Sequence, residues 1–419
     1  MRVSTFLLEA LLSATSASVC FSHAKAAVRD IAPLNRRSYI PPIGKTAIKD
    51  VRVFNGVEFT PPQTIVIEDD HIGSFDSRDV NITVNGTGKF LIPGLMDSHI
   101  HLSQPTDLEL LTSYGITTVF QMSCFNYTAC DMFRGHTGLC DFYTAGASAV
   151  GNGSSHSKQF NVSPSLLWYP NSDAVEYVDN AFNNGSDYYK ITVEDDGPTL
   201  SAQVALVRAV HSLGKQVMSH AATIKDYYQV VEPGTNGPQH IPQDGLLNTS
   251  AILKMKQQHQ FATPTMTVFH YGLVEDPTKA PQLGSPHGSD YKYVRANVGL
   301  LHSFGVPILA GTDSIGQIEG AYSTLTLPHG ETLHRELQLL VDAGLSEAEA
   351  ISAATSVPAQ WHQMFDRGVI APGKRADLLL LNGNPLENIN NTMDISRVWV
   401  QGIEYANVTK NRNAWEDQA

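Results

Sequence analysis

The middle of the chain alternates between short apolar runs of strand length and longer segments whose apolar residues have helical spacing. Runs at 117–121, 187–192, 216–220 and 306–310 predict strands, with helices between them. Such alternation predicts parallel strands joined by crossover helices, and a closed barrel is the commonest fold of this kind at this length. We therefore expect an α/β protein with a (β/α)8 TIM barrel at residues 93–365.

Some of the expected helices carry clear end signals. Ser201 is placed to cap a helix that Gly214 ends, and Ser346 with Glu349 has the spacing of a capping box.

The two ends of the chain have a different pattern. Short alternating runs broken by turn residues fill 48–75 and return at 376–402, which predicts β-structure at both ends. We expect these ends to form one small discontinuous β-sandwich, with one part at 45–92 and the other at 366–410.

The charge balance excludes some partners. The 419 residues include 28 Lys and Arg against 41 Asp and Glu, a net charge of −13, which argues against nucleic acid. After residue 30 no apolar stretch is long enough to span a membrane. Charged residues make up only 16% of the chain, against roughly a quarter in average domains. Something other than charge must therefore help to keep the surface soluble.

N-linked glycans are the candidate for that role. Residues 1–26 have a positive start, an apolar run and a small-residue cleavage site, which predict a signal peptide and a secreted protein. The alternative is a cytosolic protein whose Asn-x-Ser/Thr glycosylation sequons are accidental. Only about three such sequons would be expected by chance in this composition. The chain has nine, beginning at Asn81, Asn85, Asn126, Asn152, Asn161, Asn184, Asn248, Asn390 and Asn407.

Three cysteines lie after the predicted strand 117–121. Cys124, Cys130 and Cys140 are too few for a disulfide framework, and their odd number leaves one unpaired. We expect one bridge among them, which would restrain a loop at the barrel face where active sites form.

The strongest chemical motif is Pro93-Gly94-Leu95-Met96-Asp97-Ser98-His99-Ile100-His101-Leu102. Residues i and i+2 of a strand point to the same face, so His99 and His101 would present two imidazoles to one point. Two such imidazoles are suited to a divalent metal ion.

This stretch resembles the first barrel strand of the amidohydrolase superfamily, in the imidazolonepropionase and prolidase-like branch. The segments 371–378 and 383–386 are also typical of that family. The resemblance implies a (β/α)8 barrel with a small β-sandwich made from both termini. It also implies a metal-dependent hydrolase, in which a metal-bound hydroxide attacks the amide, cyclic amide or ester carbonyl of a small-molecule substrate.

The resemblance supplies the remaining metal ligands one by one. Lys190 stands where relatives carry a carboxylated lysine that bridges two metals, and His220 and His240 match the histidines of strands five and six. Asp313 matches the aspartate after strand eight, which would bind metal and act as the catalytic base. Ala222 and the segment 192–196 depart from the family pattern.

Several alternatives stay open. The site would hold two metals bridged by Lys190, or one metal held by four of these residues, and zinc is the default with Mn, Fe or Co as alternatives. A rival function is a secreted, catalytically inactive binding protein built on the same barrel. Four further residues are weaker candidates. We interpret His329 and His334 as pocket-lining or surface residues, and His270 and Tyr271 as residues that contact the substrate.

Overall fold

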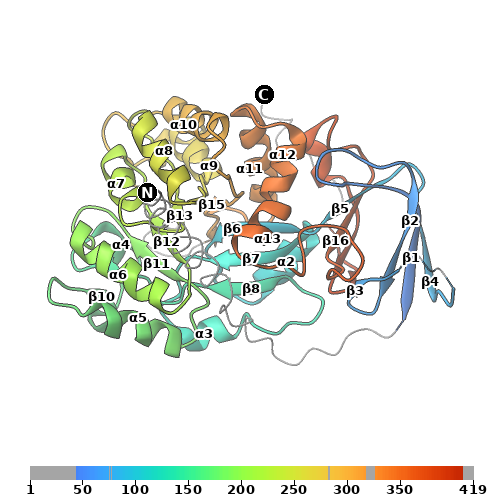
Figure 1. Cartoon of the computed structure of the whole chain (residues 1–419), viewed down its shortest axis with the longest axis horizontal. Coiled ribbons are helices and arrows are strands. Elements are labelled where there is room, and N and C mark those ends of the chain that lie inside the picture. The colour runs from blue at the N-terminus through green and yellow to red at the C-terminus, as the bar shows by residue number, and fades with distance from the viewer. Residues whose placement is uncertain (1–43, 75, 77, 282–283, 318–325, 409–419) are drawn as a thin grey trace, which may run out of the picture.

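The computed structural model describes residues 44–74, 76, 78–281, 284–317 and 326–408 (Figure 1). The predicted signal peptide, residues 1–26, lies outside these residues. No helix among the described residues is both long and apolar enough to cross a membrane.

Both ends of the chain enter one eight-stranded sheet, which lies at one end of the molecule in Figure 1. Its order is β18-β17-β16-β5-β1-β2-β3, and β4 pairs with β1. The strands are β1 (Lys45–Val53), β2 (Gln63–Glu68), β3 (His71–Ile72), β4 (Ile82–Asn85), β5 (Phe90–Pro93), β16 (Leu378–Leu381), β17 (Ile395–Val400) and β18 (Ile403–Tyr405).

The two ends meet where β5 pairs with β16 in antiparallel register, from Phe90 opposite Leu381 to Pro93 opposite Leu378. Apolar side chains from both ends, among them Leu91 and Trp399, share one buried cluster because each strand turns one face inward. The expectation that both ends build one β-structure is confirmed, whereas the domain boundaries stay a prediction.

The middle of the chain contains two three-stranded parallel sheets. One consists of β6 (Leu95–Ile100), β7 (Ile116–Gln121) and β8 (Asp141–Thr144), and the other of β11 (Tyr189–Thr192), β12 (Val217–His220) and β13 (Gly237–Gln239). Three of the four predicted strands are therefore confirmed. The prediction of a fourth strand at 306–310 is wrong, because only an isolated β-bridge forms there, between Ile308 and Ala262. Pro307 has no N–H to donate to a ladder of hydrogen bonds between strands.

Isolated parallel bridges extend these two sheets. Ala149 bridges Ile191, and Gln239 bridges Thr263. Two further bridges join Ala262 to Ile308 and Ile100 to Ser314. Two short strand pairs form separate two-stranded sheets: β9 (Val150–Gly151) with β10 (Leu167–Trp168), and β14 (Gly316–Gln317) with β15 (Thr326–Leu327).

Helices connect and surround the parallel strands in Figure 1. They are α2 (Thr106–Ser113), α3 (Tyr127–Asp131), α4 (Ser155–Gln159), α5 (Ala174–Asn183), α6 (Leu200–Ser212), α7 (Ile224–Val231), α8 (Thr249–Gln257), α9 (Met266–His270), α10 (Tyr291–Ser303), α11 (Glu331–Asp342), α12 (Glu347–Ala353) and α13 (Ser356–Trp361).

The helix ends agree only partly with their sequence signals. The capping box of Ser346 and Glu349 is confirmed at the start of α12. The cap of α6 is Thr199 and not Ser201, because the Thr199 hydroxyl accepts from the backbone N–H of Ala202 while Ser201 is already helical.

Candidate metal centre

His99 is held inside β6, where its side chain is fully buried. The carboxylate of Asp97 accepts from the backbone N–H of His99 at 3.1 Å and from the hydroxyl of Thr312 at 2.7 Å, which ties β6 to the segment that ends in Asp313. Gly311 allows this close approach, since a Cβ atom there would lie 2.9 Å from the backbone N of His99.

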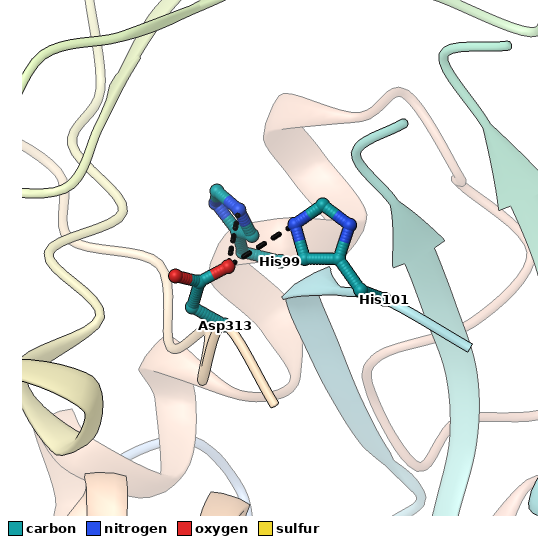
Figure 2. Close-up of side chains that lie close together, drawn as sticks. All are labelled: His99, His101 and Asp313. Atoms are coloured by element: carbon teal, nitrogen blue, oxygen red, sulfur yellow. Dashed lines mark ion pairs between the residues drawn. The ribbon is translucent and has the colours of Figure 1, made fainter. Parts of the chain in front are cut away.

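Asp313 brings its carboxylate between the two histidines of the motif. One oxygen, Oδ1, lies 3.1 Å from Nε2 of His99 and 3.1 Å from Nε2 of His101, as Figure 2 shows. The ligand atoms of these three residues all lie within 4.8 Å of one another, a spacing that suits a shared metal ion. Asp313 has a left-handed backbone with φ of 57°, a costly conformation that is common at functional sites.

Lys190 reaches the same point from β11. Its side chain is only 3% exposed, and Nζ lies 3.4 Å from Nε2 of His99. Burial lowers the pKa of the Lys190 amine to about 8, because a charged ammonium loses its hydration inside the protein.

His220 and His240 stand at the ends of neighbouring strands, β12 and β13. Their ring centroids are 4.4 Å apart, and the ring of His240 is 4.7 Å from that of His99. The Nδ1 atom of His240 contacts the hydroxyl of Thr265 at 2.8 Å, which leaves Nε2 for another partner. Contacts between neighbouring side chains thus connect all six predicted ligands into one cluster.

The electrostatics of this cluster favour neutral imidazoles beside an ionised carboxylate. Burial lowers the pKa of His99 to about 3, and it also holds the pKa values of His220 and His240 well below the usual range. Burial by itself would raise the pKa of Asp313, but the neighbouring imidazoles outweigh it and hold that pKa well below its usual value.

These residues fit a divalent cation. Neutral imidazole nitrogens and a carboxylate oxygen are the donor types that such ions take. In addition, the buried Nδ1 atom of His220 has no hydrogen-bond partner among the described residues, a costly arrangement that a bound ion or water would relieve.

One residue of the cluster has no signal in the sequence. His156, in the five-residue helix α4, packs against His220 with ring centroids 4.5 Å apart, and its Nδ1 lies 3.0 Å from a carboxylate oxygen of Glu194. Burial raises the pKa of Glu194, but the contacts with His156 outweigh it and lower that pKa. Glu194 belongs to the segment 192–196 that departs from the family pattern.

The weaker histidine candidates have mixed outcomes. The prediction that His334 lines the pocket or lies on the surface is wrong. This residue is fully buried in α11, where it contacts Thr392 and the carbonyl oxygen of Tyr114. His329 is also buried, 2.9 Å from the hydroxyl of Ser314. His270 lies 2.8 Å from Glu275, and the substrate role of His270 and Tyr271 stays a prediction.

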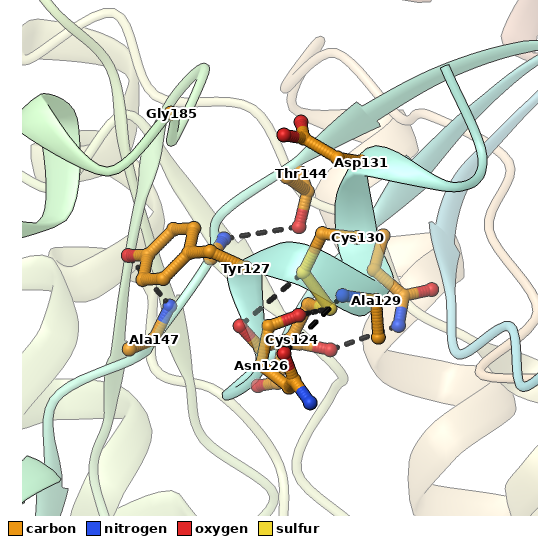
Figure 3. Close-up of a disulfide and its surroundings, with 12 residues drawn as sticks. Cys124, Asn126, Tyr127, Ala129, Cys130, Asp131, Thr144, Ala147 and Gly185 are labelled. Atoms are coloured by element: carbon orange, nitrogen blue, oxygen red, sulfur yellow. Dashed lines mark hydrogen bonds between the residues drawn. A yellow bond between two sulfur atoms is a disulfide. The ribbon is translucent and has the colours of Figure 1, made fainter.

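The predicted disulfide forms between Cys124 and Cys130, and Cys140 is a buried free thiol (Figure 3). The bridge closes the loop that follows β7, which begins with the backbone N–H of Cys124 donating to the carbonyl oxygen of Gly146. The hydroxyl of Tyr127 in this loop accepts from the backbone N–H of Ala147, two residues before the bridge between Ala149 and Ile191. The disulfide therefore restrains a loop that contacts the segment paired with β11, the strand that carries Lys190.

A family model described as the amidohydrolase family matches residues 192–403, just over half of the chain. The chain belongs to the amidohydrolase family. Three of the predicted ligands, His220, His240 and Asp313, lie inside the matched residues, and the other three precede it.

Curated relatives of this amidohydrolase include two adenine deaminases of Clostridium perfringens. The one from strain 13 is 24% identical over 378 residues, covering 82% of this chain and 56% of the relative. The one from strain ATCC 13124 is 23% identical and covers 73% of this chain and 49% of the relative. The chain thus spans about half the length of these relatives.

Solved structures show the same fold. A putative prolidase from Bifidobacterium longum has a TM-score of 0.73 at 22% identity, covering 90% of this chain and 98% of the other. A Xaa-Pro dipeptidase with bound methionine has a TM-score of 0.72 at 19% identity, covering 86% and 99%. These neighbours imply a TIM-barrel-like α/β fold for this amidohydrolase.

Proposed function

We propose that this amidohydrolase is a metal-dependent hydrolase that cleaves a C–N bond of a small-molecule substrate. The single observation that carries the proposal is the meeting of the ligand atoms of His99, His101 and Asp313 within 4.8 Å of one another. Lys190 and His240 adjoin His99, and His220 adjoins His240. An amide or cyclic amide carbonyl is the expected target, and an ester carbonyl is within the reach of the same chemistry.

A divalent cation bound there, zinc by default, would lower the pKa of a water molecule and polarise the oxygen of the substrate. Side chains of the protein would hold and transfer protons next to this cation. Asp313 keeps an ionised carboxylate, so it can accept a proton from the attacking water and pass it to the leaving amine.

Lys190 would complete the centre by reacting with carbon dioxide. Its neutral amine attacks the carbon of CO₂, a C–N bond forms while one C=O π bond opens, and the released proton passes to solvent water, which gives an anionic carbamate. Support comes from its lowered pKa and from its burial beside His99. The carbamate would bridge two metals. A single metal held by His99, His101, His220 and Asp313, beside an unmodified Lys190, is the narrower variant.

His156 would orient the substrate. Its ring contacts His220, and Glu194 lies at its Nδ1 atom, so its remaining nitrogen can contact a substrate oxygen or leaving group. His156 lies in the segment between β9 and α5, and that segment supplies none of the six proposed metal ligands.

We also propose that the parallel segments close into a (β/α)8 barrel beside a β-sandwich. Support comes from the backbone hydrogen bond of Asp187 to Thr144 at 2.8 Å and from the four isolated parallel bridges, which continue the two three-stranded sheets. The bridge between Ile100 and Ser314 would be the closing contact.

Secretion and glycosylation are part of the proposal. Eight of the nine sequon asparagines are exposed, and Asn390 is half-buried. An acidic chain with few charges gains solubility from glycans at such positions.

The rival function is a catalytically inactive binding protein. It is disfavoured because every predicted ligand position is filled and all six side chains meet. A panel of aryl amides, dipeptides, adenine and lactones, assayed with added zinc, tests the hydrolase. Turnover that a chelator abolishes and zinc restores would support it. No turnover and no zinc uptake by a folded protein would favour the rival.

A further inference from the structure

The side chain of Gln239 joins two strands that are far apart in the sequence. Its Oε1 atom lies 2.9 Å from Nδ1 of His99, 140 residues away, and both side chains are fully buried. Gln239 belongs to β13 and His99 to β6, so this contact spans the interior between the two parallel sheets.

The opposite end of the amide determines which atom faces His99. Nε2 of Gln239 lies 3.2 Å from the carbonyl oxygen of Gly237 and 3.3 Å from the hydroxyl of Thr263. A backbone carbonyl oxygen can only accept, so the amide must present its NH₂ group to Gly237. The oxygen of the amide is thereby directed at His99.

This orientation sets the hydrogen on the imidazole. An amide oxygen can only accept, so Nδ1 of His99 must be the donor. In the neutral ring the lone pair is then on Nε2, which faces Asp313 at 3.1 Å (Figure 2). The lone pair and the carboxylate oxygen are therefore placed so that one cation could bind to both.

We propose that Gln239 is a positioning residue that fixes His99 as the Nδ1–H tautomer and so prepares Nε2 to bind the metal. The inference rests on the proposed function for its metal, but the tautomer itself is a property of the metal-free protein. A residue of this kind raises metal affinity without touching the metal.

The affinity test compares three variants by chelator competition for zinc. Gln239→Leu removes the acceptor and should weaken zinc binding about 10- to 100-fold, the usual effect of losing a partner of a metal-binding histidine. Gln239→Glu keeps an acceptor at that position and should restore affinity to within a few-fold of the wild type. Gln203→Leu is the matched control, because Gln203 is equally buried and contacts Pro198 outside the cluster.

A second measurement needs no variant at position 239. Long-range ¹⁵N–¹H spectra of the metal-free wild-type protein, labelled at histidine, report the tautomer of each ring, and His99→Asn identifies the signal. We expect the Nδ1–H form at His99. Finding the Nε2–H form there, or zinc affinity in Gln239→Leu equal to that of Gln203→Leu, would overturn the inference. Absence of zinc binding by the wild type would instead overturn the proposed function, while the spectra still decide the tautomer.

Discussion

The Nζ atom of Lys190 lies 3.4 Å from Nε2 of His99, although 91 residues separate them in the chain. A buried amine beside an imidazole has little reason to be there unless it is modified or shares a ligand. Replacing Lys190 with Ala should reduce bound zinc from two equivalents per chain to one, with a loss of activity. Elemental analysis of the purified protein measures this.

The matched control is Lys256→Ala, which changes an exposed lysine of α8 and should leave two equivalents. One equivalent in both the wild type and Lys190→Ala would establish the mononuclear variant.

His156 should affect turnover more than metal content. His156→Asn removes the ring beside His220 and should lower kcat about 100-fold, the usual cost of losing the correct position of a reacting group. Glu194→Gln should change kcat in the same direction, since Glu194 orients that ring. Zinc content should stay unchanged in both variants. The exposed His136 provides the control, as His136→Asn should retain wild-type kcat.

Glu336 should make stability decline as the pH rises. It is fully buried and accepts from the backbone N–H groups of Met266 and Thr267, and burial raises its pKa to about 7. Between its unfolded pKa of about 4.3 and about 7, the folded state binds more protons than the unfolded state, so the free energy of unfolding falls across this window.

The comparison variant for this pH dependence is Glu336→Gln. Denaturant unfolding of both proteins from pH 4 to 8 gives the difference in unfolding free energy. The wild type should lose stability relative to Glu336→Gln as the pH increases. A difference that stays constant over this range would contradict the assignment.

The Cys124–Cys130 bridge should stabilise the protein modestly, because it closes a short loop. Cys124→Ser combined with Cys130→Ser should lower the free energy of unfolding by about 2 kcal/mol. A reducing agent should lower the stability of the wild type to the same degree and leave the double variant unchanged. Equal stability of the reduced and oxidised wild type would argue against a contribution from the bridge.

Glycosylation can be mapped after expression in a eukaryotic secretory host. Enzymatic removal of N-linked glycans should lower the mass, and peptide mapping should find exposed sites such as Asn152 and Asn184 occupied. Asn390 should have the lowest occupancy, because the hydroxyl of Thr392 in its sequon is buried and contacts His334. Uniformly unmodified asparagines would contradict the predicted secretion.

Local patterns predicted the parts of the fold that depend on local chemistry. The capping box at Ser346 and three of the four central strands are confirmed. Both kinds of prediction depend on the spacing of polar and apolar residues over only a few positions. The expected strand at 306–310 failed because Pro307 interrupts the ladder. The start of α6 was misplaced by two residues, since Thr199 and Ser201 both carry a hydroxyl and only the backbone conformation distinguishes them.

The candidate site was predictable where a motif or a resemblance marked it. All six proposed ligands meet, yet His156 and Gln239 had no signal, because their contacts with His220 and His99 arise only from tertiary packing. His334 shows the converse, since a histidine of an amphipathic helix can be a core residue when two polar partners are buried with it.

The pairing of β5 with β16 has a consequence for synthesis in the cell. A nascent chain exposes the edge of β5 until the ribosome has released residue 381, nearly 300 residues later, and unpaired strand edges recruit other chains. Premature termination anywhere before β16 would therefore yield aggregating fragments, whatever the state of the cluster around His99.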